Sequence, residues 1–301
     1  MGLRPLTAQT QAIAHTHLVR LLTALRSLPN PKDAFTPSLV RYTLFPLSHL
    51  LTRNNPAGRK EGEVGYIADR TLEVLFECIT WIMQRWLEDV EEVDARIWEQ
   101  LWRMVVLILG GPIGSVSRLR PHRAEETIEA GVELLGVLVC SPPSEDMRNA
   151  VFGPGRRLLP VLFHAISTLI DIATSATSSQ VIQRALQILE SILVNWFADD
   201  DKARVLAGVM PGIISAIVKI ISGAPSVAQS RGMQTVWNDV NASKQTSSRK
   251  PPTTDIACAA LQLFSSVVVL TIGDVPLTAC GVLAAQVSDL ESLVNDINVN
   301  E

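Results

Sequence analysis

Residues 72–83 of the chain read LEVLFECITWIM, with apolar side chains at Leu72, Phe76, Ile79 and Met83. Steps of four, three and four residues place these side chains along one face of an α-helix. The same steps return three more times, and the anchors are then Ile128, Val132, Leu135 and Val139; Ile182, Leu186, Leu189 and Leu193; and Ile256, Ala260, Leu263 and Val267. A helix pattern that returns in this way predicts stacked repeats, each of which buries its apolar face against its neighbours.

Another apolar helix is predicted directly before three of these four helices, as the first member of a pair. Each of these three preceding helices carries a proline. The prolines are Pro46, Pro160 and Pro211. A proline inside a helix bends it, because the ring removes one backbone hydrogen bond and clashes with the preceding turn. The first helix before Ile128, near residues 98–109, has no proline. Kinked first helices and straight second helices are typical of HEAT units.

We therefore predict an all-α fold, an α-solenoid of about five HEAT/armadillo-like helical hairpins that forms one array over residues 1–301. The first anchors lie 56, 54 and 74 residues apart. These distances exceed the roughly 40–47 residues of an ideal HEAT or armadillo unit, and loops explain the excess. Apolar spacing predicts helices near residues 5–28, 37–52, 66–87, 94–109, 123–140, 157–175, 179–198, 202–222, 254–272 and 276–296.

Capping and loop residues mark where several of these helices start and stop. Thr36 before Pro37 is a good N-cap, and Gly110-Gly111-Pro112 is a strong stop signal. Residues 54–65 are polar and include glycine, so we predict an exposed loop there. We predict a longer, mobile loop over residues 223–253, because this polar segment buries too little apolar surface to offset the entropy that ordering would cost. The longer loop is either an inert insertion or a modified or partner-binding segment.

Composition excludes several classes of protein. The chain has 301 residues, 47% of them hydrophobic and 19% charged, so wholesale disorder is excluded. Its 26 basic and 30 acidic residues give a net charge of −4, which argues against a dedicated nucleic-acid binder. The uncharged run 256–273 contains polar residues and has acidic flanks, so it predicts a buried core helix rather than a membrane span. No apolar signal segment develops after Met1, which disfavours secretion.

Motifs for catalysis, cofactors and metals are absent from the sequence. It contains no phosphate-binding loop, nucleophile elbow or paired-histidine zinc helix. His15 and His17 are two residues apart and point away from each other on a helix, while His49, His122 and His164 are isolated. We therefore predict no catalytic, cofactor-binding or metal-binding residues and no enzyme activity. A site hidden between helices is the weakest alternative.

Other prominent side chains favour packing or solvent over binding. Cys78, Cys140 and Cys258 fall within the recurring helices, where a free thiol packs as a small apolar group. Four tryptophans favour a core position over a binding hot spot, and these are Trp81, Trp86, Trp98 and Trp102.

Two charged clusters each leave two interpretations open. The acidic run is Glu88, Asp89, Glu91, Glu92 and Asp94, and it is a solvated turn or, alternatively, a site for a basic partner. The basic cluster is Arg118, Arg120, His122 and Arg123, and we expect Arg156 and Arg157 to join it in space. It is a solvated loop or, alternatively, a site for an acidic partner.

Three stretches resemble a known family. Residues 42–51 read YTLFPLSHLL, and 69–75 and 97–101 read DRTLEVL and IWEQL. Together they resemble the N-terminal region of the Tel-two-interacting protein one (TTI-one) family, and residues 255–261 are compatible with its further helical repeats. Members of the family are much longer, so the chain would correspond to about their N-terminal third.

The resemblance implies a non-catalytic scaffold in the TTT co-chaperone complex. That complex works with the chaperone Hsp90 to mature and stabilise the phosphatidylinositol 3-kinase-related kinases (PIKKs). The implied partners are the other TTT subunits, client PIKKs and Hsp90-associated factors. We expect no cofactor, no direct contact with nucleic acid and no membrane span. The resemblance implies a location in the cytoplasm and nucleus. The alternative is an unrelated HEAT-repeat adaptor, in nuclear transport or chromosome organisation.

Overall fold

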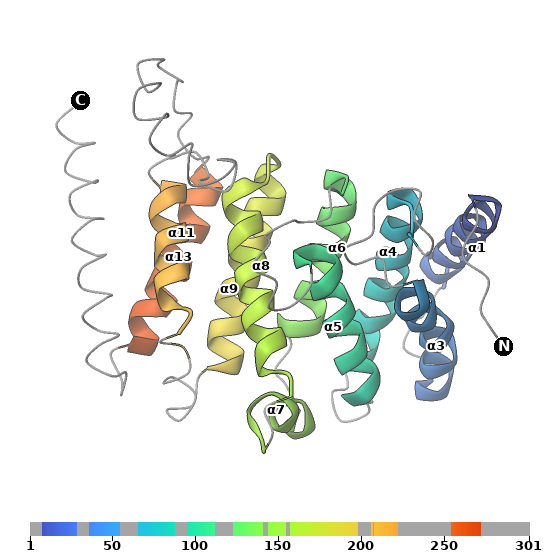
Figure 1. The fold of residues 1–301 in the computed structure, drawn as a ribbon, viewed down its shortest axis with the longest axis horizontal. Coiled ribbons are helices and arrows are strands. Elements are labelled where there is room, and N and C mark those ends of the chain that lie inside the picture. The colour runs from blue at the N-terminus through green and yellow to red at the C-terminus, as the bar shows by residue number, and fades with distance from the viewer. Residues whose placement is uncertain are drawn as a thin grey trace, which may run out of the picture. The chain divides into compact units, whose positions relative to one another are not determined.

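A computed structural model describes residues 8–28, 36–54, 66–87, 95–111, 123–140, 144–154, 157–197, 206, 208–221 and 254–271. These residues form helices and no strand (Figure 1). The helices are α1 (Ala8–Arg26), α3 (Pro37–Asn54), α4 (Asp69–Trp86), α5 (Ala95–Gly110), α6 (Glu125–Cys140), α7 (Glu145–Phe152), α8 (Leu159–Ser175), α9 (Ser179–Trp196), α11 (Met210–Ile221) and α13 (Thr254–Thr271). The fold is an all-α solenoid of helical hairpins, as predicted. Over the same residues, no helix has the length and apolar character that crossing a membrane requires.

The chain divides into two compact units, residues 1–165 and 166–301. The boundary falls within α8, so the two units are described separately. A single array over residues 1–301 stays a prediction.

The first unit contains a row of three helices backed by their partners. Helix α4 packs against α1 on one side and α6 on the other, while α3 packs against α4 and α5 packs against α6 (Figure 1). The predicted stripe on α4, Leu72 to Met83, is completely buried. Gly131 of α6 permits close approach, because a Cβ there would lie 2.7 Å from Cδ2 of Leu109 and 3.1 Å from Cε2 of Phe76. The absence of a side chain at this position lets α6 pack closely on both α4 and α5.

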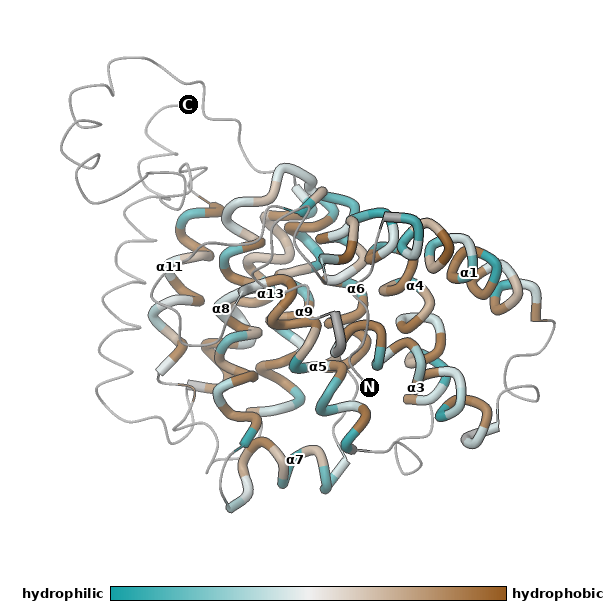
Figure 2. Tube along the Cα trace, turned by 45° about the vertical axis from the view of Figure 1, so that its right-hand side comes forward, coloured by the Kyte–Doolittle hydropathy of each residue, from teal (hydrophilic) through white to brown (hydrophobic). Residues whose placement is uncertain are grey.

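The second unit follows the same pairing rule. Helix α13 packs against both α9 and α11. Its stripe residues Ala260, Leu263 and Val267 are buried, as are three of the four anchors on α9. Apolar and polar segments alternate along the helices of the chain, so each helix offers an apolar stripe for its neighbour (Figure 2).

Helix ends agree with the capping residues of the sequence. The hydroxyl of Thr36 accepts a hydrogen bond from the backbone N–H of Leu39 at 3.4 Å, as expected for an N-cap. Gly111 ends α5 with a φ of 78°, in the left-handed region that glycine adopts without strain.

The structure corrects two predictions about the helices. Of these three prolines, Pro46 lies in the interior of a helix, whereas Pro160 and Pro211 are the second residues of α8 and α11. In a first turn the missing N–H of proline costs nothing, so these two prolines start helices rather than bend them. Helix α7 was also not predicted. Its N-cap is Ser144, whose hydroxyl accepts from the N–H of Met147 at 3.3 Å.

Several predicted segments lie partly or wholly outside the described residues. Asn54 ends α3, and the rest of the predicted loop 54–65 is outside them, as are the loop 223–253 and the helix 276–296. The helix predicted over 202–222 is described from Met210 as α11.

Candidate partner-binding groove

A second stripe runs along α4 and α6, one residue after each core anchor. On α4, Glu73 and Glu77 follow Leu72 and Phe76; on α6, Glu129 and Glu133 follow Ile128 and Val132. A shift of one residue rotates a side chain by about 100° around a helix, from the buried face towards the edge of the packed row. The core spacing thus determines where these carboxylates lie.

The equivalent positions change in character along the chain. They are both glutamate in the first two repeats, Gln183 and Gln187 in the third, and Ala257 and Leu261 in the fourth. The acidic stripe is therefore a property of α4 and α6.

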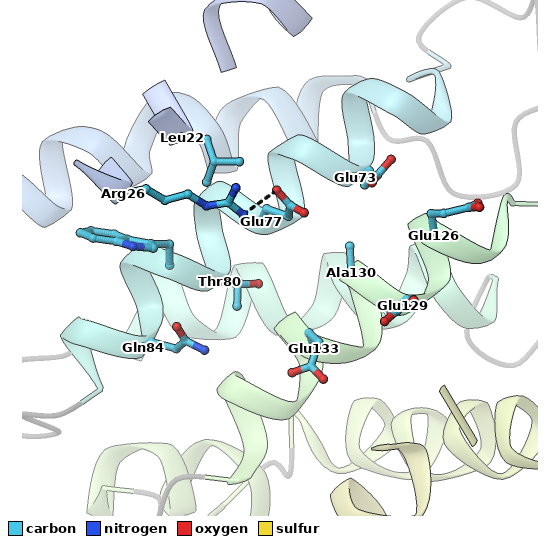
Figure 3. A pocket seen from close by; sticks show the side chains of 11 residues that line it. Leu22, Arg26, Glu73, Glu77, Thr80, Gln84, Glu126, Glu129, Ala130 and Glu133 are labelled. Carbon is cyan, nitrogen blue, oxygen red and sulfur yellow. Dashed lines mark hydrogen bonds and ion pairs between the residues drawn. The ribbon is translucent and has the colours of Figure 1, made fainter. Parts of the chain in front are cut away.

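These carboxylates line a groove with a volume of about 470 Å³. Figure 3 shows side chains of three neighbouring helices around it. Helix α1 contributes Leu22 and Arg26, α4 contributes Glu73, Glu77, Thr80, Trp81 and Gln84, and α6 contributes Glu126, Glu129, Ala130 and Glu133. The groove exists because α1, α4 and α6 stack as a row in the first unit.

The groove is strongly acidic. Its lining carries five glutamates and one arginine, which gives a formal charge of −4, the same as that of the whole chain. Nη2 of Arg26 lies 3.2 Å from Oε2 of Glu77 in an exposed ion pair (Figure 3). The residues outside the lining include 25 acidic and 25 basic side chains, so their formal charges sum to zero.

Neighbouring carboxylates raise the affinity of Glu73 for protons. The pKa of Glu73 is raised by partial burial, and next by the charges of Glu77 and Glu126, while His15 and Arg70 act in the opposite direction. Glu73 thus lies where negative charge exceeds the nearby positive charge.

Trp81 adds a flat apolar surface to the lining. The guanidinium carbon of Arg85 lies 3.8 Å from the centre of the Trp81 ring, in a cation–π contact. Carboxylates beside an aromatic ring suit a cationic segment that buries some apolar area. Within the described residues, no group of three His, Cys, Asp or Glu side chains could hold a metal ion.

The histidines named from the sequence do not come together. His15 and His17 lie on α1, half-buried and exposed respectively. Nε2 of His164 is 2.8 Å from the carbonyl oxygen of Gly111, and the ring of His49 stacks on that of Phe45. His122 is outside the described residues.

The cysteines differ more than predicted. Cys78 is buried, with Sγ 3.6 Å from the carbonyl oxygen of Leu18, and burial raises the pKa of its thiol to about 12. Cys140 is half-buried, but Cys258 is exposed, so the prediction that Cys258 packs in the core was wrong. It lies on the outer side of α13, two residues after the buried anchor Ile256.

Three of the four tryptophans, Trp86, Trp98 and Trp102, are buried, as predicted. The indole N–H of Trp98 donates to the carbonyl of Leu138 at 3.0 Å, which ties α5 to α6. Trp81 is half-buried and lines the groove.

Arg123 corrects the interpretation of the basic cluster. Its side chain is only 2% exposed and pairs with Oδ1 of Asp69 at 2.8 Å. It also donates to the carbonyl of Ile67 at 2.8 Å and lies 4.4 Å from the ring centre of Tyr66. Arg123 therefore joins the segment before α6 to the start of α4, and is neither a solvated loop residue nor a free site for an acidic partner.

Most of the remaining charged residues named from the sequence are not described. Arg157 is exposed, and its Nη2 lies 3.5 Å from Oε2 of Glu99. Residues 88–94, which hold the acidic run, and Arg118, Arg120 and Arg156 are outside the described residues.

The groove glutamates were not singled out from the sequence, although a signal was present. Charged residues at i, i+4 on α4 and at i, i+3, i+7 on α6 share the spacing of the core stripes. Recognising a groove also required the contact of α4 with α6, two helices separated in the chain by α5.

Comparisons with known proteins agree with this architecture. The family model described as the TTI1 N-terminal TPR domain matches residues 3–294. A TELO2-interacting protein 1 homolog of Mus musculus is 25% identical over 234 residues, which cover 73% of this chain and 19% of that protein. The chain thus spans about a fifth of the length of this relative. No solved structure matches the chain.

Proposed function

Because this chain belongs to the TTI1 N-terminal TPR domain family, we propose that it acts as a scaffold in a TTT-type co-chaperone complex. The observation that carries the proposal is the match of the family over residues 3–294. The name of the mouse relative describes that protein as one that interacts with TELO2. By analogy, the partner proposed for this chain is a TELO2-like subunit.

The helical hairpins supply the kind of surface that such a role needs. Stacked repeats present rows of exposed side chains, and binding then requires complementary charge and shape rather than catalytic groups. The groove of α1, α4 and α6 is the surface in the described residues that best fits this requirement. We propose it as a contact site for a basic segment of a TTT subunit.

The finer role follows from the family resemblance. In this proposal the complex works with Hsp90 to mature and stabilise PIKKs, in the cytoplasm and nucleus. The scaffold holds the other subunits close together, which raises the effective concentration of chaperone factors around the client kinase.

Co-purification tests the scaffold proposal. The protein, tagged in cells that express it, should recover a TELO2-like subunit, and its depletion should lower the steady-state amounts of PIKKs. Recovery of neither TTT subunits nor a PIKK would overturn the proposal.

A charge-reversal variant tests the groove separately. Glu126→Lys combined with Glu129→Lys should lower recovery of the basic partner at least ten-fold, because attraction becomes repulsion. The matched control reverses Glu145 and Asp146 of α7, which are exposed acidic residues outside the groove. If wild type recovers the partner and the groove variant does so equally, the scaffold role stands and the groove is not the contact site.

A further inference from the structure

Helix α3 presents an apolar surface on its outer side as well as its inner side. The inner residues Val40, Leu44 and Leu51 are buried against the rest of the first unit. On the outer side Tyr42 is 80% exposed and Phe45 is 68% exposed. Two large aromatic side chains this exposed on one helix are unusual, since exposed apolar clusters on soluble domains commonly mark interaction surfaces.

The aromatic side chains form one ordered surface. Tyr42, Phe45 and His49 are spaced by three and four residues, so they lie on one face of the helix. The rings of Phe45 and His49 stack with centres 5.9 Å apart and an angle of 7° between their planes. A stacked pair has already lost part of its side-chain freedom, so covering it costs little further entropy.

The charge of α3 restricts what can cover this face. The helix, Pro37–Asn54, contains two arginines and no aspartate or glutamate. Arg41 is exposed and lies beside the aromatic residues. A complementary surface therefore combines apolar side chains with carboxylates, which is opposite in sign to what the acidic groove attracts.

We propose that the outer face of α3, formed by Leu39, Arg41, Tyr42, Phe45 and His49, docks an acidic amphipathic helix of a partner protein. Apolar residues at three- and four-residue spacing on that helix cover Tyr42 and Phe45, and an Asp or Glu beside them pairs with Arg41. The face is separate from the groove residues, and the inference does not depend on the partner being a TTT subunit.

Site-specific crosslinking in cells identifies the occupant. A photoreactive benzoylphenylalanine in place of Tyr42 in the full-length protein, followed by mass spectrometry, should give crosslinks to a helical segment of another protein with apolar residues and nearby Asp or Glu. The matched control places the same group at Val269 of α13, which is 67% exposed. Crosslinks from position 42 to this same chain, to lipid or to nothing would each overturn the proposal.

Affinity measurements then test the chemistry with the crosslinked segment as a synthetic peptide. Phe45→Ser and Arg41→Glu should each weaken binding at least ten-fold without lowering the melting temperature, because both side chains are exposed. Leu261→Ser, at an exposed apolar position on α13, should leave the affinity unchanged. Unchanged affinity in Arg41→Glu would overturn the charge pairing and with it the acidic partner. Binding to phosphatidylserine vesicles that Phe45→Ser abolishes would identify a membrane surface instead.

Discussion

Cys78 and Cys258 lie six and two residues after Leu72 and Ile256, the first anchors of their stripes. The surroundings of each thiol decide its reactivity. Cys78 is buried and the pKa of its thiol is about 12, so at pH 8 on the order of one molecule in ten thousand carries the thiolate. We expect a maleimide to modify Cys258 in the native protein and Cys78 only after unfolding. Mass spectrometry of labelled peptides checks this, and rapid native labelling of Cys78 would contradict the packing of α4 on α1.

Glu73 makes stability depend on pH in a predictable direction. Its pKa in the folded protein is raised from an ordinary value of 4.5 by partial burial and by Glu77 and Glu126. Because the pKa of Glu73 is higher in the folded than in the unfolded protein, the protonated group favours folding. This contribution to the free energy of unfolding is complete below the pKa of the unfolded state, and it is lost as the pH rises through the pKa of the folded state. At pH 7 the ionised carboxylate of Glu73 is therefore less favourable in the folded protein than a neutral side chain would be.

We expect Glu73→Gln to stabilise the protein at pH 7, by less than about 1 kcal/mol since the group is partly solvated. The advantage should disappear near pH 4, which thermal melts at both pH values can show. Glu145→Gln, on the exposed side of α7, should give no stabilisation at pH 7. A lower melting temperature for Glu73→Gln at pH 7 would contradict the sign.

Residue environments were predictable where one helix determines them and not where two distant segments meet. The anchors such as Phe76 were correctly placed in the core, because their spacing alone gives the buried face. Arg123 was misplaced because its partners Ile67 and Asp69 lie more than fifty residues earlier in the chain. The groove was missed for the same reason.

At the scale of elements, the same helix α9 should respond very differently on its two faces. Leu186 is completely buried, so Leu186→Asp would place an unpaired carboxylate in the core and should cost about 4 kcal/mol. Val194, on the same helix, is 49% exposed. Val194→Asp should cost less than about 1 kcal/mol, including the unfavourable effect of a negative charge near the helix C-terminus. Denaturant titrations of both variants measure the difference, and equal costs would contradict the assigned buried face.

The long helices of the described residues were predicted well. The short helix α7 and the helix starts that contain a proline were not. Helix α7 has only eight residues and a weak apolar pattern, so its main signal was Ser144 followed by Glu145 and Asp146. Pro160 and Pro211 illustrate a second difficulty, because the same residue type ends, bends or starts a helix depending on a position that sequence fixes only to within a few residues. The pairing of α3 with α4, of α5 with α6 and of α11 with α13, in contrast, follows from the recurrence of the stripes.

At the scale of the whole molecule, the chain divides into two compact units, each with its own set of packed helices. In the first, α4 lies between α1 and α6; in the second, α13 contacts α9 and α11. Repeat proteins gain stability from nearest-neighbour contacts, so a defect spreads first to the helices that touch the altered one. Local opening is therefore expected to follow the units rather than the whole chain.

Matched core substitutions in the two units test this expectation. Ile79→Asp on α4 should increase amide hydrogen exchange in α1, α4 and α6 and leave α9 and α13 protected. Leu186→Asp on α9 should give the reverse, with exchange increased in α9 and α13. Hydrogen-exchange mass spectrometry reports both sets of peptides in one experiment. Loss of protection in both units from either substitution would mean that the chain unfolds as one cooperative block, since an independent unit cannot transmit the loss of its core to a separate one.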